Sequence, residues 1–304
     1  MRTLSVLAIA SVLFIAPVLL ATNNNVFAQN SVTQGIGQLQ LATQLGICLS
    51  GVNTFISCNN LSNQEQTNFG NNVAGQQGGS GSGSGNTATQ GIGQSQSVKQ
   101  GAVCVSGDGT FGSCNNLSNQ EQTNFGNNVA GQQGGSGYKG GGNTATQGIG
   151  QSQSANQGSL CVSGGSTSAS CNNLSNQEQT NFGNNVAGQQ GGSGSGSGNT
   201  ATQGIGQSQS ANQRSLCVSG DDTSASCNNL SNQEQTNFGN NVAGQQGGSG
   251  YKGGGNTATQ GIGQSQSANQ GSLCVSGGST SGSCNNFNSQ TQTNYGNNVI
   301  GQTR

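Results

Sequence analysis

The chain has 304 residues, of which 56 are Gly, 28% are hydrophobic and 4% are charged, and it contains no His and no Trp. The absence of His excludes His-dependent nucleophilic dyads and triads, His-ligated zinc and the usual general base near neutral pH. A net charge of −1 leaves no basic field to hold nucleic acid or an anionic membrane. We therefore expect no enzyme, no cofactor and no nucleic-acid partner.

Residues 1–28 have the pattern of a secretory signal peptide. Arg2 gives a positive start, residues 4–20 are mostly apolar, and Val26 and Ala28 are small residues at the −3 and −1 positions of a cleavage site. The alternative is an N-terminal membrane anchor, which the shortness of the apolar stretch and Pro17 disfavour. Both interpretations place the remainder, residues 29–304, outside the cytoplasm, secreted or at the cell surface.

Residues 29–304 form a five-fold internal repeat. The first Cys of each repeat stands at position 48, 104, 161, 217 or 274, so the repeat length alternates between 56 and 57 residues. The Gly/Ser linkers alternate in the same way, which indicates that a double unit was duplicated. Such periods are typical of solenoids, in which each unit packs only against its neighbours. The repeats cover approximately residues 30–85, 86–142, 143–198, 199–255 and 256–304.

Each repeat contains two segments with the alternation of a β-strand, here named the first arm and the second arm. In the third repeat the first arm covers residues 144–157 and the second arm covers residues 173–189. A Cys-bounded segment, 161–171, forms one hinge, and the Gly/Ser tract 191–199 forms the other. One face of the second arm carries Gln and Asn, and the opposite face carries Leu174, Glu178, Phe182 and Val186. The pattern leaves open which of these two faces is buried.

Composition also allows a disordered chain, because each repeat offers few large apolar side chains to offset the entropy of ordering. The absence of Pro argues against disorder. Pro17 is the only Pro in the chain, and strands that donate every N–H to a ladder exclude Pro. We therefore expect an all-β fold, an amyloid-like β-solenoid of five stacked strand-hinge-strand rungs with one disulfide per rung.

In-register stacking would place each residue about 4.8 Å from its equivalent in the next repeat. A primary amide both donates and accepts, so a column of Gln or Asn bonds the copies above and below it. The predicted ladder columns are Gln34, Gln90, Gln147, Gln203 and Gln260; Ile36, Ile92, Ile149, Ile205 and Ile262; and Asn72, Asn128, Asn185, Asn241 and Asn298.

Two further columns carry aromatic and acidic side chains. The aromatic column consists of Phe69, Phe125, Phe182, Phe238 and Tyr295. The acidic column consists of Glu65, Glu121, Glu178 and Glu234. Stacked carboxylates repel one another, so we expect the acidic column in solvent, with a calcium site as the alternative.

The repeats resemble the curlin repeats of curli-type functional amyloid. The resemblance lies in the Gln, Gly, Asn and Ala pattern of Gln179, Gly183, Asn185, Ala187 and Gln189, and more loosely in residues 147–150. It extends over nearly the whole of residues 29–304 as architecture, although curlin units are less than half as long and usually lack Cys. The resemblance implies strand-turn-strand units and a tendency to assemble into fibres.

Every repeat has one pair of Cys separated by nine residues. In a secreted chain without His this spacing favours disulfides within each repeat over a zinc site. Pairing between like Cys of adjacent repeats is the alternative, but five per column would leave one thiol unpaired on each side. The expected disulfide cysteines are Cys48, Cys58, Cys104, Cys114, Cys161, Cys171, Cys217, Cys227, Cys274 and Cys284.

The terminal repeats carry extra apolar residues, which favours pairing through their open edges. The first repeat adds Leu39, Leu41, Leu45 and Ile47, and the fifth has Ile300 in place of Ala. We expect a secreted structural subunit that binds copies of itself end to end in extracellular fibres, for matrix, sheath or attachment to a cell surface or matrix component. The alternatives are a monomeric ice-binding or adhesive solenoid, suggested by repeated Thr-Ala-Thr segments, and a disordered Gly-rich coat or spacer.

Overall fold

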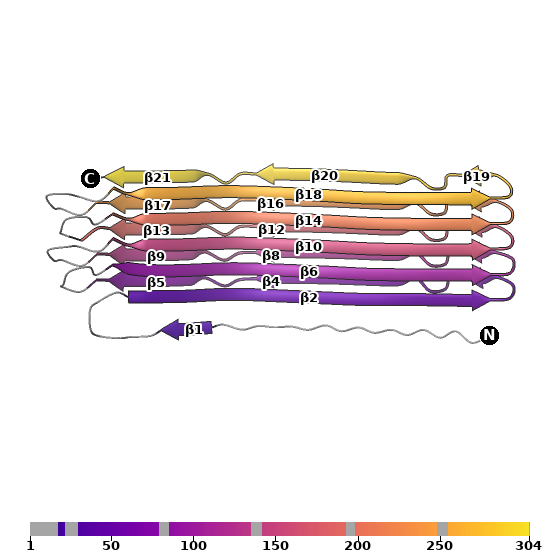
Figure 1. Cartoon of the computed structure of the whole chain (residues 1–304), viewed down its shortest axis with the longest axis horizontal. Coiled ribbons are helices and arrows are strands. Elements are labelled where there is room, and N and C mark those ends of the chain that lie inside the picture. Colours follow the sequence, from indigo (N-terminus) through magenta and orange to yellow (C-terminus); the bar gives the residue numbers. More distant parts are fainter. Residues whose placement is uncertain are drawn as a thin grey trace.

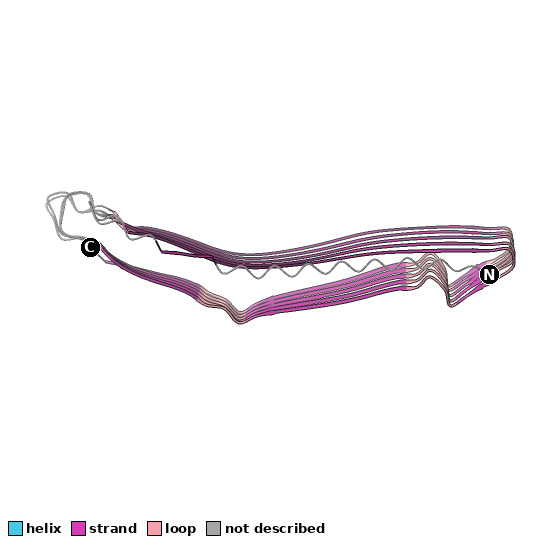
Figure 2. Ribbon diagram, turned by 90° about the horizontal axis from the view of Figure 1, so that it is seen from below, coloured by secondary structure: helices cyan, strands magenta, loops and turns pink. Residues whose placement is uncertain are grey.

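The computed structural model describes residues 18–21, 30–78, 85–134, 142–192, 198–247 and 255–303. These residues form strands and turns, with no helix among them, and stack as five rungs (Figure 1). Figure 2 looks along the stack and shows two layers, with the long strands in one layer and the shorter strands in the other. The predicted all-β fold of five stacked rungs is confirmed, and the disordered chain that the composition also allowed is not what these residues form.

Each rung contributes four strands. Rung one consists of β2 (Asn30–Ser50), β3 (Thr54–Phe55), β4 (Asn60–Asn68) and β5 (Asn72–Gln77). Rung two consists of β6 (Asn86–Ser106), β7 (Thr110–Phe111), β8 (Asn116–Asn124) and β9 (Asn128–Gln133). Rung three consists of β10 (Thr144–Ser163), β11 (Thr167–Ser168), β12 (Asn173–Asn181) and β13 (Asn185–Gln190). Rung four consists of β14 (Thr200–Ser219), β15 (Thr223–Ser224), β16 (Asn229–Asn237) and β17 (Asn241–Gln246). Rung five consists of β18 (Thr257–Ser276), β19 (Thr280–Ser281), β20 (Asn286–Asn294) and β21 (Asn298–Thr303).

Equivalent strands of successive rungs pair in parallel and form four sheets that are not closed into a barrel. The register is the one that stacking of equivalent residues requires: Gln147 pairs with Gln90 on one side and with Gln203 on the other. One further strand, β1 (Val18–Ala21), pairs antiparallel with β2 at the outer edge of rung one. Each strand residue of a rung therefore pairs with the residue at the equivalent position of the next rung.

The first arm continues further than the predicted residues 144–157. The long strand β10 ends at Ser163, so Cys161 lies inside the strand and not at the start of a hinge. The alternation continues to the end of the strand: Cys161 is buried, and Leu160 and Val162 face outward. A β-branched residue such as Val162 also favours a strand. The hinge accordingly begins after Ser163 and contains the short strand β11.

The second arm is interrupted at residues 182–184, yet its inward and outward faces keep the same phase on both sides of the break. Gly183 at the break packs closely against rung two and against the first arm. A Cβ at Gly183 would collide with the carbonyl oxygen of Gly126 and would lie 2.9 Å from Ile149 Cδ1. Only glycine fits this close approach. The face that is buried is the amide face.

The interior of the stack is therefore polar. Among the described residues the largest fully buried side chains are glutamines, and Val98 is the single apolar one in that group. Alanine, isoleucine and disulfide columns fill the remaining interior positions. Of the large apolar residues of the third repeat, only Ile149 points inward, and Phe182 is 40% exposed.

The predicted signal peptide, residues 1–28, lies outside the described residues except for β1. Most of the Gly/Ser linkers between rungs also lie outside them. Within the described ranges there is no helix long and apolar enough to span a membrane.

Candidate functional site

The glutamine columns form continuous hydrogen-bond ladders through the stack. Gln147 Nε2 donates to Gln90 Oε1 at 2.8 Å, and Gln147 Oε1 accepts from Gln203 Nε2 at 2.7 Å. The same Nε2 also donates to the carbonyl oxygen of Val186 in the facing arm at 3.0 Å. Each interior glutamine of rungs two to four is bonded in this way to the rung before it, the rung after it and the opposite layer, which satisfies a buried polar group without water.

The asparagine columns form ladders that run in the opposite direction. Asn185 Nδ2 donates to Asn241 Oδ1 of the following rung at 2.9 Å, and Asn185 Oδ1 accepts from Asn128 at 2.9 Å. Asn185 Nδ2 also donates to the carbonyl oxygen of Gly204 in the first-arm layer at 2.9 Å. The Gln ladders therefore donate towards rung one, whereas the inward Asn ladders donate towards rung five. The outward Asn columns, such as that of Asn176, donate towards rung one like the Gln ladders.

The isoleucine column lies between two glutamine ladders on the inward face of the long strands. Ile92, Ile149 and Ile205 are each 3% exposed and form one cluster, which Ile36 and Ile262 extend to the end rungs. The structure thus brings together the members of all three predicted columns, each within its own column.

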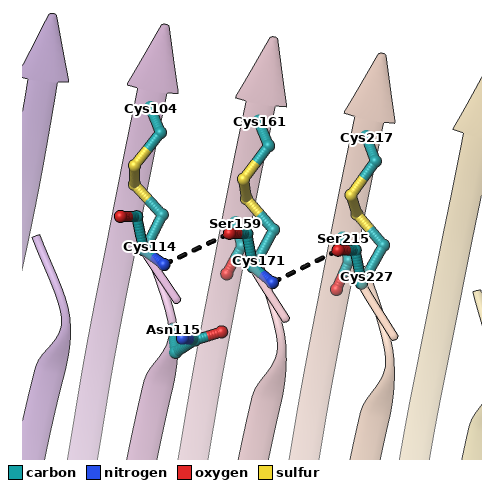
Figure 3. Close-up of a disulfide and its surroundings, with 12 residues drawn as sticks. Cys104, Cys114, Asn115, Ser159, Cys161, Cys171, Ser215, Cys217 and Cys227 are labelled. Carbon is teal, nitrogen blue, oxygen red and sulfur yellow. Dashed lines mark hydrogen bonds between the residues drawn. A yellow bond between two sulfur atoms is a disulfide. The ribbon is translucent and has the colours of Figure 1, made fainter. Parts of the chain in front are cut away.

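All ten cysteines form disulfides, one in each rung, which confirms the pairing predicted within repeats. In every rung the Cα atoms are 6.0 or 6.1 Å apart, which is ordinary disulfide geometry. Figure 3 shows the disulfides repeating from rung to rung, with Ser159 and Ser215 beside them. Ser159 accepts from Asn116 of rung two and donates to Asn173 of its own rung, which joins the disulfide column to the amide ladders.

Sulfur atoms of neighbouring rungs also lie close together. The Sγ atoms of Cys161, Cys171 and Cys217 lie within 4.8 Å of one another. Because each of these sulfurs is held in a disulfide, none is a thiolate that could bind a metal ion. In the described part of the chain, the groups of three or more Cys, Asp or Glu side chains that are compact enough to share an ion consist of disulfide-bonded cysteines and do not include the acidic column.

The hinge turns the chain through two residues with positive φ. In rung three these residues are Ala169 (φ 49) and Cys171 (φ 57). Gly112 and Gly282 occupy the Ala169 position in rungs two and five, and they adopt this conformation without the cost that a Cβ imposes. The disulfide holds the second of these turn residues against the long strand.

The acidic column lies on the exposed outer face of the second arm. Burial of the carboxyl group raises the pKa of Glu178, and the neighbouring charges of Glu121 and Glu234 raise it further. The aromatic column shares this face. Phe125, Phe182 and Phe238 have parallel rings with centroids 4.9 Å apart, and Tyr295 stacks on Phe238 at 5.0 Å.

The extra apolar side chains of the terminal rungs do not point along the stack. Leu39, Leu41, Leu45 and Ile47 all face sideways from β2, because side chains of a strand project perpendicular to its sheet. These four side chains therefore flank the end of the stack and do not lie on its end surface. The end surfaces instead consist of strand edges and ladder termini.

The two ladder termini differ. At rung five, the Oε1 atom of Gln260 is buried and has no hydrogen-bond partner, because no described rung follows to donate to it. At the same end Asn298 accepts from Asn241, which leaves its own N–H groups directed away from the stack. At rung one, Gln34 accepts from Gln90 and Asn72 donates to Asn128.

Comparisons of the chain with known protein families, with curated proteins and with solved structures find no match.

Proposed function

We propose that the chain is a secreted structural subunit that polymerises end to end into amyloid-like extracellular fibres. The observation that carries this proposal is the chemical match between the two ends of the stack. Rung five ends on the carbonyl groups of the inward Gln and the N–H groups of the inward Asn. Rung one begins with the N–H groups of the inward Gln and the carbonyl groups of the inward Asn. A second copy placed head to tail would therefore continue these inward ladders with donors facing acceptors.

The backbone edges support the same assembly. β18 to β21 and β2 to β5 are the outermost strands of their sheets, apart from the short β1 on β2. Cleavage after Ala28 would remove β1 and free the whole edge of β2. An uncovered strand edge gains its missing hydrogen bonds by pairing with another edge. The junction between two copies would then repeat the parallel pairing that joins rungs within one copy.

Compartment and resemblance agree with this function. Five disulfides are compatible with an extracellular location, where such bonds form and persist. The resemblance to curlin repeats points to fibres of the same kind, for matrix, sheath or surface attachment. The principal partner is a second copy of this chain, and the cell surface and other matrix components are the further partners.

Electron microscopy and fibre diffraction of residues 29–304 test the proposal directly. We expect unbranched fibres and a reflection near 4.8 Å along the fibre axis, which is the spacing of paired strands. Protein that stays monomeric at high concentration, without this reflection, would overturn the proposal.

Two substitutions test the matched ends without disturbing the interior. Gln34→Glu and Asn298→Asp keep the oxygens that accept from Gln90 and Asn241 but replace the junction donors by carboxylates. We expect the double variant to fold as the wild type and to elongate at least tenfold more slowly at pH 7. Acidification below about pH 4 should restore elongation, because a protonated carboxyl donates again.

The matched control is Asn59→Asp, which adds a carboxylate to the exposed surface of rung one and keeps the oxygen that accepts from the backbone N–H of Asn115. The one bond that it loses, the donation to the carbonyl oxygen of Gly112, is made with rung two and does not cross the junction. The control should elongate at nearly the wild-type rate. Equal rates for the double variant and the wild type would exclude head-to-tail continuation of the ladders.

The second candidate function is a monomeric ice-binding or adhesive module, which one observation favours. The Thr residues of the Thr-Ala-Thr segments face outward while the Ala between them is buried, as for Thr144, Ala145 and Thr146. Two Thr columns therefore run side by side along the stack. Thermal hysteresis or inhibition of ice recrystallisation by monomeric protein, lost on replacement of the outward Thr residues by Lys, would support this function over fibre formation.

A further inference from the structure

The outer face of the second arm carries three apolar columns, of Phe, Leu and Val, and we name it the ridge face. The Phe and Leu columns supply its two ridges. One is the aromatic column, in which Phe125, Phe182 and Phe238 are each 40% exposed. The other is a column of Leu, represented by Leu117 at 37% and Leu230 at 38% exposure. Continuous exposed apolar surface of this kind is unusual for a monomer and marks an interaction site.

The outer face of the long-strand sheet is indented by grooves that could receive the ridges, and we name it the groove face. A groove of about 840 Å³ runs along the stack over a column of Gly, and Leu39 lines its rung-one end. An added Cβ at Gly93, Gly150 or Gly206 would meet no atom within 4 Å. A second groove of about 520 Å³ lies over Gly101 and Gly158.

The ridges and grooves are spaced alike. Leu174 and Phe182 are eight residues apart on the ridge face, and Gly158 and Gly150 are eight residues apart on the groove face. Gln157 bonds the carbonyl oxygen of Leu174, and Gln151 bonds that of Thr180, so each groove lies directly behind one ridge. A sideways shift of one stack onto another, without rotation, would therefore place both ridges over both grooves.

Charge is also complementary between the two faces. The four Glu residues of the acidic column lie on the ridge face. Lys99 and Arg214, the basic residues of the described ranges, lie on the groove face and are exposed. In rung four Arg214 occupies the position that Gly158 has in rung three, so its side chain interrupts the second groove. The groove over the Gly150 column is continuous through all five rungs.

We propose that the groove face is a docking surface for the ridge face of a second copy, with the Phe column seated in the groove over the Gly150 column. This inference rests on the proposed function, because the bodies that stack sideways are the fibres. The Phe column and the Gly150 column both repeat once per rung, so the contact area between two fibres would grow in proportion to their length. The acidic column would then face the side that carries Lys99 and Arg214.

Filling the groove tests the proposal. The triple variant Gly93→Val, Gly150→Val, Gly206→Val adds outward side chains where nothing is within 4 Å, and valine suits a strand. We expect fibres with the wild-type reflection near 4.8 Å, at least tenfold fewer lateral bundles, and loss of a side-to-side repeat of about 20 Å, two sheet spacings. The matched control is Gly131→Val, Gly188→Val, Gly244→Val on the ridge face. Its added side chains extend no further from the sheet than those of the neighbouring Val186 column, so we expect bundling to be unchanged.

A mixing experiment makes the test specific for these two faces. The triple variant Phe125→Ser, Phe182→Ser, Phe238→Ser removes the ridge and should also give single fibres. Preformed groove-filled fibres mixed with preformed ridge-deleted fibres retain one intact ridge face and one intact groove face between them. We expect paired fibres in this mixture and none in either variant alone.

The outcomes separate this inference from the proposed function. Wild-type fibres that stay single, or groove-filled fibres that bundle like the wild type, would overturn lateral docking and leave end-to-end assembly in place. Absence of fibres from the wild type would overturn the proposed function. Loss of the reflection near 4.8 Å from the groove-filled variant alone would show that its glycines are required for folding. The ridge-deleted variant then provides the test: single fibres support lateral docking, and bundles like those of the wild type overturn it.

Discussion

The inside of each rung is more polar than much of its outside. Gln177 and Gln179 are fully buried between the two layers, whereas Phe182, three residues further along, is 40% exposed. This inversion is stable in a ladder because a buried amide such as that of Gln177 bonds its own copy on both sides, so that its Nε2 has an acceptor and its Oε1 has a donor. An outward phenylalanine is partly covered by the rings above and below it. Stacking in register thus removes the usual need for an apolar core.

The largest expected effect on stability comes from placing a charge in the interior of the stack. Gln177→Glu would remove the donation to Gln120 and place a carboxylate in the interior, so we expect a loss of about 3 to 5 kcal/mol in the free energy of unfolding. The outward neighbour Asn176 provides the matched change: Asn176→Asp loses one bond, to Asn119, and should cost about 1 kcal/mol. Chemical denaturation followed by circular dichroism measures both. Equal losses would show that the interior is hydrated.

The disulfide column tests the hinge side of the interior. Replacing Cys161 and Cys171 together by Ala should lower stability by about 3 kcal/mol, because the open chain regains the entropy of a short closed loop. Val162→Ala, a change at the outward neighbour, should cost less than half as much, since Val162 is only half-buried. Hydrogen exchange of the hinge in rung three should rise only in the cysteine variant. Unchanged exchange there would mean that the amide ladders alone hold the hinge.

An outward aromatic contributes less than an inward amide. Phe182→Ala would interrupt the ring stack between Phe125 and Phe238, and we expect a loss of about 1 kcal/mol in an isolated subunit. Thr180→Ala on the same face should change stability by a few tenths of a kcal/mol. Thermal unfolding of the two variants beside the wild type gives the comparison. A loss for Phe182→Ala as large as that for Gln177→Glu would contradict the inversion.

The smallest effect is expected from pH. The pKa of Glu178 is raised in the folded rung, by burial and then by Glu121 and Glu234, so the folded state binds a proton more tightly than the unfolded chain. Stability should therefore rise as the pH falls from 7 through the raised pKa towards the ordinary value of 4.5. A variant with Gln at all four acidic-column positions should show no such rise. Thermal midpoints between pH 7 and pH 4.5 test this, and a wild type that loses stability over this range would refute it.

The repeat length and the cysteine spacing were sufficient to predict the register and the disulfides, because both depend on equivalence between repeats. The buried face of the second arm was harder, because Leu174 and Phe182 share their face with Glu178, and an apolar face is ordinarily the inner one. The acidic column carried the missing signal: since its stacked charges belong in solvent, Leu174 and Phe182 must face outward with it.

Other features depend on contacts that the sequence pattern does not contain. β10 extends to Ser163 because the alternation of inward and outward residues continues through Cys161. The prediction of a hinge bounded by the two cysteines ended this strand too early. The break at Gly183 reflects its approach to Gly126 and Ile149. The direction of each ladder is also absent from the pattern, because Gln147 donates to the preceding rung and Asn185 donates to the following rung.

The opposed ladder directions have an electrical consequence for a long fibre. Amide groups aligned in one direction add their dipoles, as peptide groups do along a helix, and leave partial charges of opposite sign at the two ends. Here the inward Asn side chains point against the Gln side chains, as Asn185 and Gln147 do, so the dipoles of the two sets partly cancel. The side-chain potential along the axis therefore accumulates more slowly with fibre length than it would if all the ladders ran in one direction.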